Sequence, residues 1–253
     1  MSEIRQNRLS MHCPEFKKAM DESDQQKGLP HPPQGNVVTG ELIELPYSEN
    51  VISQPSYSQL LDIRRSERVF SDAVMTKEHL AFLLWSTQGV QDYRGANNHA
   101  TLRPTPSGGA RHPFELYCVV SRVEGLKPGL YRYAPLEHVG EKRVSVEYMG
   151  AFENYEERIT EMMANQKWAS KAPVVLIFTC VPYRSEWRYT NASHRVALID
   201  LGHAGQNTML SATALGIGSC CIAAYNQELC DAALGVNGID EYTVYAIPVG
   251  AVK

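Results

Sequence analysis

The stretch from Ser193 to Tyr225 constrains the fold of this chain more than any other. Its apolar and small residues recur at alternating steps of three and four, at Leu198, Leu201, Gly205, Thr208, Ala212 and Leu215. This is the period of an α-helix. Between Val196 and Gly218 the only formal charge is Asp200, so the helix offers little polar surface to water. Such a helix is typical of the core of a large protein. The sequence therefore predicts a buried helix over residues 193–215.

The residues within and after this helix suggest how it is used. The apolar run is interrupted by four polar residues, Asp200, His203, Gln206 and Asn207, so the helix is not expected to span a membrane. We expect the line of Asp200, His203 and Asn207 to be structural, with His203 a core histidine whose hydrogen bonds are satisfied. The helix should end at Gly216-Ile217-Gly218, because glycine commonly follows a helix C-terminus. The small apolar segment 219–224 that follows could press backbone against a flat ligand.

Length and composition limit the class of protein. The chain has 253 residues, 43% of them hydrophobic, enough for one sizeable core or two small ones. Its formal net charge of −4 argues against a general nucleic-acid binder. No apolar run follows a basic start near the N-terminus, so we expect no signal peptide and a cytoplasmic location. The six cysteines have no CxxC or other metal-ligand spacing, and buried reduced thiols are the simplest expectation.

The other elements follow from periodicity and turn residues. Residues 1–36 are polar and predict a poorly packed arm, part of an N-terminal extension over 1–50 that precedes a domain over 51–253. Strands are expected at 37–46, 114–120, 130–133, 174–180 and 242–249. Helices are expected from about 57, over 76–89, over 153–168 and over 227–234, with a loop at 92–103. The sum is an α+β fold whose strands share one sheet covered by helices.

Two segments carry residue types suited to a phosphorylated or planar ligand. Arg64, Arg65 and Arg68 lie within five residues around Ser66, and on a helix Arg64 and Arg68 would share a face. The alternative is a solvated basic helix end, which this motif alone favours. Pro106-Ser107-Gly108-Gly109 offers a hydroxyl and no bulky side chains, so a ligand ring or phosphate could approach its backbone. By itself it is equally consistent with a tight turn before a strand.

The pair Arg188-Tyr189 precedes the long helix. The tyrosine could donate a proton or serve as an interface aromatic, and the sequence does not decide between them. Neither an HExxH zinc motif, nor a GxSxG nucleophile motif, nor a GxGxxG dinucleotide fingerprint occurs in the chain. Metal, serine-hydrolase and Rossmann chemistry are therefore not expected.

Taken in order, several segments resemble the nitroreductase-like FMN oxidoreductases. The resemblance is closest to the SagB-type dehydrogenase branch, which includes azoline oxidases of peptide heterocycle synthesis. It extends over about residues 60–250 and rests on segments 64–70, 83–89, 106–117, 123–131, 202–207, 214–220 and 247–250. It implies an intertwined homodimer with a mostly antiparallel sheet flanked by helices. Two FMN molecules would bind at the dimer interface, and the long helix would pack across it.

Carried onto this chain, the resemblance implies a set of FMN-binding residues. Arg64, Ser66 and Arg68 would hold the phosphate, the ribityl chain and the pyrimidine edge, with Arg65 nearby. Pro106, Ser107, Gly108 and Gly109 would line one side of the ring. The other side would be crossed by Cys221, Ile222, Ala223 and Ala224, whose backbone N–H groups would address the N5 and O4 edge. Lys253 is the one basic residue near the C-terminus that could add a phosphate contact.

Two departures from the family pattern bear on the reaction. Ala110 stands where nitroreductases commonly carry Asn, as in the SagB-type branch. Azoline oxidases resemble Lys-Tyr at the place of Arg188-Tyr189, and an arginine is a poor general base because it stays protonated. The leading expectation is therefore a reductase that takes hydride from NAD(P)H onto FMN and reduces a small-molecule acceptor. The alternatives are an azoline dehydrogenase acting on a modified peptide and a non-catalytic flavin-binding protein.

Overall fold

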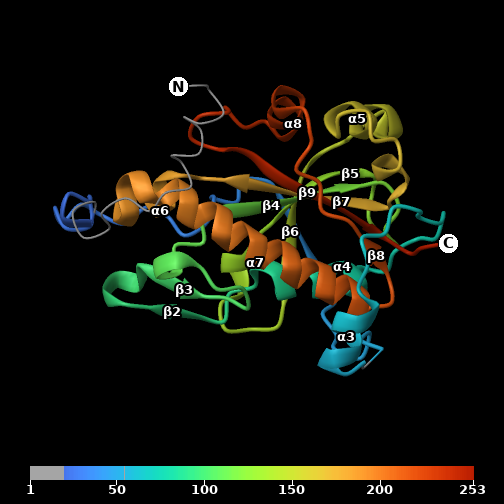
Figure 1. Ribbon diagram of the computed structural model, residues 1–253, viewed down its shortest axis with the longest axis horizontal. Helices are drawn as coiled ribbons and strands as arrows, with labels where there is room; N and C mark the ends of the chain where they lie inside the picture. The colour runs from blue at the N-terminus through green and yellow to red at the C-terminus, as the bar shows by residue number, and fades with distance from the viewer. Residues whose placement is uncertain (1–19, 54) are drawn as a thin grey trace.

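A seven-stranded sheet forms the centre of the computed structural model, which describes residues 20–53 and 55–253 (Figure 1). Its strand order is β1-β6-β5-β4-β7-β9-β8, and each strand is antiparallel to its neighbours. The strands are β1 (Glu41–Leu45), β4 (Phe114–Val120), β5 (Gly129–Tyr133), β6 (Val144–Gly150), β7 (Val174–Cys180), β8 (Gly218–Ser219) and β9 (Tyr242–Gly250). The predicted α+β class with a mostly antiparallel sheet is confirmed.

Helices cover both faces of this sheet. They are α3 (Tyr57–Ile63), α4 (Lys77–Gln88), α5 (Tyr155–Met162), α6 (Tyr183–Tyr189), α7 (Ser193–Ala214) and α8 (Gln227–Leu234). The bounds of α4 follow from its caps: the Thr76 hydroxyl accepts from the His79 N–H, and Gly89 follows the last turn. The helices α4 and α7 pack on one face of the sheet, while α5 and α8 lie on the opposite face (Figure 1).

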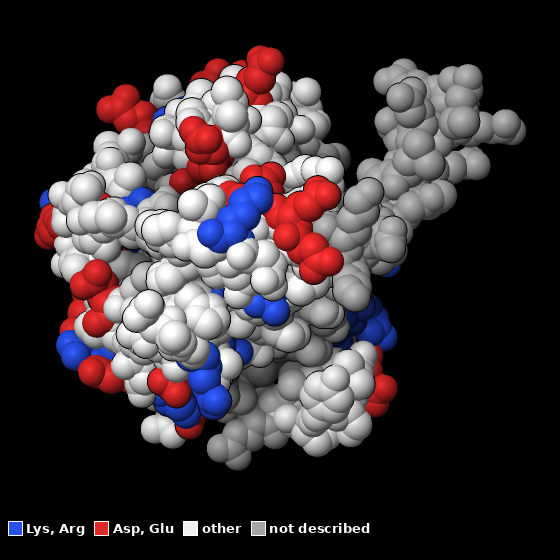
Figure 2. Space-filling model, turned by 90° about the vertical axis from the view of Figure 1, so that its left-hand side faces the viewer, with Lys and Arg blue, Asp and Glu red and all other residues white. Residues whose placement is uncertain are grey.

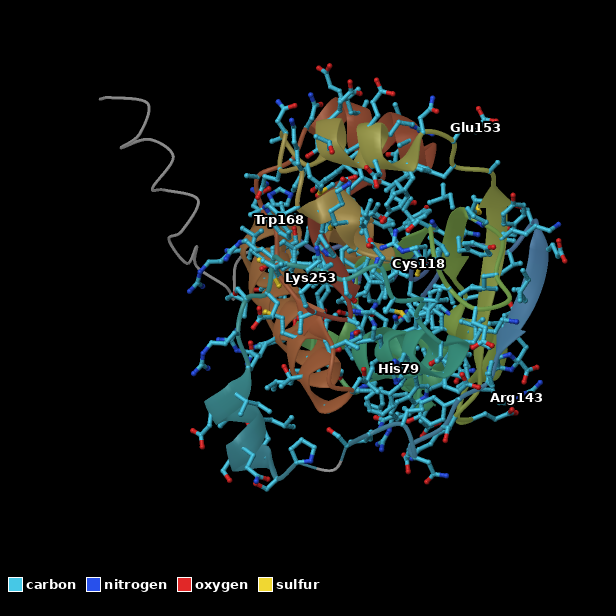
Figure 3. The ribbon with its side chains drawn as sticks, turned by 90° about the vertical axis from the view of Figure 1, so that its right-hand side faces the viewer. His79, Cys118, Arg143, Glu153, Trp168 and Lys253 are labelled. Carbon is cyan, nitrogen blue, oxygen red and sulfur yellow. The ribbon has the colours of Figure 1, made fainter. Side chains whose placement is uncertain are left out.

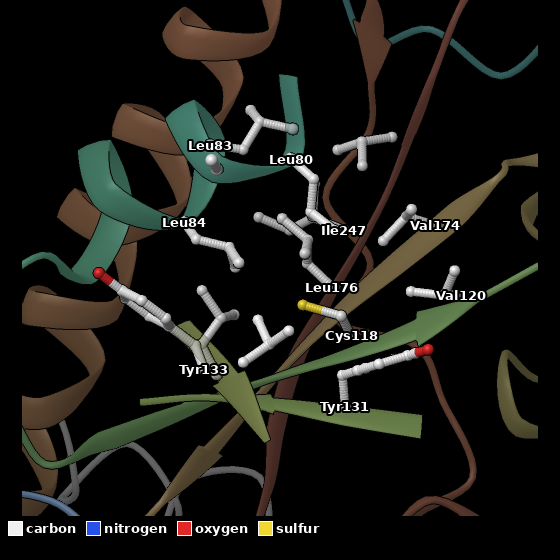
Figure 4. Close-up of a cluster of buried hydrophobic side chains, with 14 of the residues drawn as sticks. Leu80, Leu83, Leu84, Cys118, Val120, Tyr131, Tyr133, Val174, Leu176 and Ile247 are labelled. Carbon is white, nitrogen blue, oxygen red and sulfur yellow. The ribbon is translucent and has the colours of Figure 1, made fainter. Parts of the chain in front are cut away.

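The strand β7 separates two apolar layers. Val174, Leu176 and Phe178 face the layer under α4 and α7, whereas Val175 and Ile177 face the layer under α5 and α8. The expected continuous apolar strand, buried on both faces, is confirmed. Figure 4 shows the first layer, where leucines of α4 point at Cys118, Leu176 and Ile247 of the sheet.

The long helix α7 lies close to its neighbours because its inner residues are small. A Cβ on Gly205 would stand 2.8 Å from the Tyr245 ring, so a larger residue would push the helix off β9. On the α4 side, the hydroxyls of Thr208 and Thr87 are hydrogen bonded at 2.9 Å. The helix ends at Ala214, and Gly216 follows with φ +70°, as the glycine pattern predicts.

Part of the expected burial of α7 is wrong for the single chain. Leu198 is 63% exposed and Ile199 is 47% exposed, and both lie on the outer face of the helix. His203 is also exposed, so it is not a core histidine. The polar line is structural at its other two members: Asp200 is buried, and Asn207 donates to the Ser86 carbonyl at 2.5 Å.

Two local predictions are corrected. Residues 92–103 form a small antiparallel hairpin of β2 (Asp92–Arg94) and β3 (Ala100–Leu102), whose three-residue strands are too short to show an alternating pattern. The helix expected over 153–168 covers only Tyr155–Met162, because Ala164 and Asn165 adopt positive φ and break it. The rest of that segment forms turns, and a short 3-10 helix, Ala169–Lys171, follows it.

The described part of the predicted arm, residues 20–36, is well packed. Ser23 and Gln34 are buried, and the Gln34 side chain donates to the His99 carbonyl at 2.7 Å. The Trp187 indole of α6 donates to the Leu29 carbonyl at 3.0 Å. Residues 37–46 include the predicted edge strand, β1, which pairs with β6. Polar composition here reflects hydrogen bonding to the domain rather than solvation; residues 1–19 lie outside the described part.

Candidate functional site

The arginine segment follows helix α3 but does not continue it. The helix ends at Ile63, and Arg64 is its C-terminal cap with φ −55° and ψ 125°. The expectation that Arg64 and Arg68 share a helix face is therefore wrong. Instead the chain runs beside the short strand β8, which follows α7. Ser66 forms a parallel β-bridge with Ser219 of this strand.

The C-terminus closes the other side of this segment. Phe70 forms an antiparallel bridge with Val252, and the Lys253 N–H donates to the Val69 carbonyl at 3.2 Å. The structure therefore brings together the arginine segment, the start of segment 219–224 and Lys253, as the site prediction requires. Figure 3 looks onto this end of the molecule and labels Lys253 and Trp168 there. We call this group the arginine half-site: Arg64, Arg65, Ser66, Arg68, Cys220, Cys221, Ile222, Ala223, Ala224 and Lys253.

The side chains of the arginine half-site differ in what they contact. Arg65 turns back and donates to the carbonyls of Asp62 and Arg64, both at 2.8 Å, so it acts as a basic helix end. The Arg68 guanidinium lies 5.6 Å from the centroid of the Trp168 ring. No ion pair involves these arginines or Lys253 within the described residues. The half-site thus presents positive charge that is not neutralised locally.

Two cysteines lie close enough to these arginines to feel their charge. Burial raises the pKa of Cys220, and the nearby positive charge of Arg68 opposes that shift. Burial likewise raises the pKa of Cys221, with Arg64 opposing it. Both thiols are therefore neutral small residues at pH 7. In the described chain all five cysteines are free, as expected for reduced thiols, while Cys13 lies outside it.

Segment 222–224 contributes backbone in two different ways. Ile222 is buried, and its N–H donates to the Ala246 carbonyl of β9 at 2.8 Å. That donor is therefore used by the sheet rather than free for a ligand. Ala223 and Ala224 are exposed, and the Ala224 carbonyl accepts from the Gln166 side chain at 2.9 Å.

The loop Pro106–Gly109 is anchored to the N-terminal half of α7. Ser107 Oγ donates to the Asp200 carboxylate at 2.6 Å, and the Gly108 N–H donates to the same group at 3.0 Å. Burial raises the pKa of Asp200, and these two hydrogen bonds oppose the shift. A Cβ on Gly108 would lie 2.4 Å from Val196 of α7, so only glycine permits this contact.

Gly109 joins this loop to α6. Its φ of +59° is in the left-handed region, where glycine is favoured. A Cβ there would lie 2.6 Å from Tyr189 Oη and 2.7 Å from Arg188 Cδ. The structure thus packs the side chains of the candidate pair Arg188-Tyr189 against Gly109 of the loop. We call this second group the loop half-site: Pro106, Ser107, Gly108, Gly109, Arg188, Tyr189 and Asp200.

Residues that the sequence did not single out support the loop half-site. Arg111 is 1% exposed, donates from Nε to the Gly109 carbonyl at 3.1 Å and lies 5.1 Å from the Trp187 ring centroid. The His112 N–H donates to Ser107 Oγ at 2.9 Å. Asp200 had a sequence signal, since it is the one charge in the long helix. Nothing in the sequence indicated that Trp168 contacts Arg68 or that Gln25 contacts Arg188.

His112 gives a testable pH dependence. It is 3% exposed, and burial, reinforced by Arg103, lowers its pKa from 6.5 to about 2. Below pH 6.5 the unfolded chain binds a proton that the folded chain does not, so stability falls as pH falls. Between pH 7 and pH 5 we expect a loss of about 2 kcal/mol from this group. Urea unfolding at both pH values should show that His112→Gln loses about this much less than the wild type; equal losses would contradict the assignment.

The two half-sites lie at opposite ends of α7 in one chain. Asp200 contacts the loop half-site, whereas Ala214 ends the helix beside β8 and the arginine half-site. The fourteen helical steps from Asp200 to Ala214 rise about 21 Å, and only Cys221 of the arginine half-site reaches back toward the middle of the helix, where its Sγ lies 3.6 Å from the position of a Cβ on Gly205. Figure 1 shows α6 and the β2-β3 hairpin at one end, with α3, β8 and the C-terminus at the other. One chain therefore does not bring all the predicted residues together.

Other kinds of site find no support in the described residues. Across residues 20–53 and 55–253, no group of three or more His, Cys, Asp and Glu side chains could hold a metal ion. No helix there is long and apolar enough to cross a membrane. Acidic and basic side chains are interspersed on the face that Figure 2 presents, which is unlike a continuous basic surface for nucleic acid.

The structure thus combines an antiparallel sheet flanked by helices with a cationic half-site and a glycine-loop half-site. The chain belongs to the nitroreductase family, whose model, described as "Nitroreductase family", matches residues 61–251. It is therefore placed among oxidoreductases, and members of this family generally use a flavin.

Individual relatives agree with this placement. A protein of Methanocaldococcus jannaschii, named as a nitroreductase, is 30% identical over 209 residues, covering 82% of this chain and 95% of its own. The microcin B17-processing protein McbC of Escherichia coli is 22% identical over 191 residues, covering 72% of this chain and 68% of its own. A solved structure from Ralstonia eutropha JMP134, also named as a nitroreductase, has a TM-score of 0.65 at 21% identity and covers 89% of this chain and 99% of its own. That likeness confirms the nitroreductase-like fold.

Proposed function

We propose that the protein is a cytoplasmic FMN-dependent oxidoreductase that takes hydride from NAD(P)H and reduces a second small molecule. The observation that carries this proposal is the arginine half-site, where positive charges without local ion pairs surround a segment of small residues. An FMN phosphate would supply the missing negative charge, and its ring needs a wall without bulky side chains. The chemistry that FMN supplies when bound is hydride transfer between the nicotinamide and the acceptor.

In this proposal the residues of the arginine half-site bind and orient the cofactor. Arg64, Ser66 and Lys253 hold the phosphate and ribityl chain through charge-assisted hydrogen bonds. Arg68 places positive charge near the pyrimidine edge, which favours the anionic reduced state. Arg65 has a lesser role because its guanidinium is used by the end of α3. Cys221, Ala223 and Ala224 offer small surface and backbone to the ring, and buried Ile222 supports them.

A second copy of the chain would complete the site. The arginine segment and the loop Pro106–Gly109 lie near opposite ends of α7, about 21 Å apart along the helix, so the loop that lines a ring held by the arginine segment would come from another chain. Leu198 and Ile199 are exposed on the outer face of α7, which suits packing against a second α7. Helix α3 has no buried residue, and its exposed Tyr57, Leu61 and Ile63 offer further apolar surface. We therefore propose a homodimer in which Pro106–Gly109 of one chain lines the ring held by the other.

A second candidate is an azoline dehydrogenase acting on a modified peptide. It is favoured by the similarity to McbC, the microcin B17-processing protein of Escherichia coli. Tyr189 lies behind the glycine loop, where it could serve such a reaction, but Arg188 cannot be the base that removes a ring proton. This candidate predicts azole product from a heterocycle-bearing peptide without net consumption of NAD(P)H.

The visible spectrum of the purified protein, followed by anaerobic titration with NADH or NADPH, tests the leading proposal. We expect a yellow protein, or one that turns yellow with added FMN, and bleaching by a nicotinamide. A protein that takes up no FMN would contradict the cofactor. A yellow protein that no nicotinamide bleaches faster than free flavin would favour a non-catalytic flavin-binding protein. A monomer by light scattering would contradict the two-chain site.

A further inference from the structure

No carboxylate of the described residues forms an ion pair with the Arg188 guanidinium. Among the described residues it makes one hydrogen bond, from Nη1 to the Gln25 side-chain oxygen at 3.0 Å, and no ion pair. Its Nε is buried there without a hydrogen-bond partner. Its Cζ lies 5.6 Å from the centroid of the Tyr189 ring, which is attractive for a cation but does not cancel the charge.

A second guanidinium increases this positive charge. Burial, together with the positive charge of Arg188, lowers the pKa of Arg111 to about 10. Arg111 donates to the carbonyls of Gly109 and His99 and packs on Trp187, so its partners are neutral too. Neither guanidinium has an ion pair within residues 20–53 and 55–253, and two interacting like charges favour the binding of an anion.

The N-terminal segment holds Arg188 in place without removing its charge. The Gln25 N–H donates to the Trp187 carbonyl at 2.9 Å, so the backbone of this segment is fixed to α6. Tyr183 at the start of α6 donates to the Asp24 carboxylate at 3.0 Å. A carboxylate at position 25 would make a stronger bond to Arg188. The neutral amide found there orients the guanidinium and leaves its charge for another partner.

We propose that Arg188, oriented by Gln25, binds the carboxylate of the acceptor, so that the enzyme prefers acceptors bearing a planar oxyanion. This rests on the proposed function, in which the Gly109 loop lines the ring. The Arg188 side chain packs against Gly109 of that loop. An arginine recognises a planar carboxylate through paired donors, whereas it cannot serve as a base. The role also explains why an arginine suits this position: it selects the substrate and moves no proton.

The test is equilibrium binding of benzoate and its neutral isostere benzamide to the full chain supplied with FMN. Isothermal titration should show wild-type protein binding benzoate at least about tenfold more tightly than benzamide. Gln25→Glu places a carboxylate beside Arg188 and should bring this ratio close to one. Arg188→Gln should do the same. Gln26→Glu adds the same charge on an exposed neighbouring residue and should leave the ratio unchanged.

Unchanged benzamide binding and FMN content would show that Gln25→Glu remains folded. An equal benzoate preference in Gln25→Glu, Arg188→Gln and wild type would overturn the proposal, as would no preference in the wild type. The phosphates of NAD(P)H are another oxyanion source. A raised KM for NADH or NADPH in Gln25→Glu, with benzoate binding unaltered, would assign Arg188 to them and contradict a carboxylate role. Since binding requires no turnover, failure of hydride transfer would be seen separately in the nicotinamide titration.

Discussion

Replacing Arg64 and Arg68 together with alanine is expected to weaken FMN binding by about two to four orders of magnitude. Each charge-assisted hydrogen bond contributes about 1.5–3 kcal/mol, and each 1.4 kcal/mol is a tenfold change in affinity. Neither side chain forms an ion pair with another described residue, so their removal leaves no carboxylate of the described chain unpaired. Quenching of FMN fluorescence on titration with each protein gives the dissociation constants.

Arg65→Ala is the matched control for this double variant. It removes the same kind of charge one residue from Arg64, but its guanidinium is bonded to the Asp62 and Arg64 carbonyls. We expect a loss of FMN affinity below about tenfold, since only a longer-range charge effect remains. Equal losses for Arg65→Ala and for the double variant would mean that net charge, rather than the placement of Arg64 and Arg68, controls binding. Wild-type affinity in the double variant would remove the arginine half-site from the cofactor proposal.

The elements that could be predicted from sequence are those specified locally. Helix α8 matches its predicted bounds and β7 does too, because one has an Asn226 cap and a Gly235 stop, and the other is a continuous apolar run ended by a turn. The glycine after α7 was equally informative. In contrast, the Arg64 segment was expected to be helical from its spacing alone. Its pairing with Ser219 and Val252, residues far along the chain, extends it instead.

The N-terminal segment shows why polar composition misled the prediction of an arm. The Asn36 N–H donates to the buried Glu115 carboxylate at 2.8 Å, and the Gly40 N–H donates to the buried Glu147 carboxylate at 2.6 Å. The Asn36 side chain is used in the same way, since it donates to the Glu241 carboxylate at 2.7 Å and accepts from Arg184 at 2.8 Å. Polar groups that bond to the domain give the segment a composition like that of a solvated chain. Only the tertiary structure distinguishes the two.

The predicted site residues fall into two groups that the sequence could not arrange. The arginine segment and Lys253 meet because this segment pairs with β8 at Ser66–Ser219 and with the end of the chain at Phe70–Val252, which are long-range contacts. The adjacency of Gly109 with Arg188 likewise depends on α6 folding back over the loop. Exposure of Leu198 was missed for a related reason: an apolar helix predicts burial, but a single chain does not supply every surface that covers it. The cofactor roles of these residues stay predictions.

Arg184→Met is expected to destabilise the fold by about 3–5 kcal/mol, because it leaves the carboxylate of Glu115 buried without its partner. The ion pair joins Arg184 Nη2 to Glu115 Oε1 at 2.5 Å, and both side chains are 4% exposed. Arg184 also donates to the Asn36 side chain at 2.8 Å, so the pair ties α6, β4 and the N-terminal segment together. Urea unfolding at pH 7 measures the loss.

Two further variants separate the cost of an unpaired buried charge from that of a lost side chain. The double variant Arg184→Met with Glu115→Gln should recover part of the stability, because no charge is then left buried. Arg143→Met breaks the exposed pair with Glu44 and should leave the unfolding midpoint almost unchanged, since water screens that pair. If the double variant were no more stable than Arg184→Met, packing of the Arg184 side chain rather than its charge would hold α6. In that case the orientation of Arg188, four residues along the same helix, would depend on packing and on Gln25 alone.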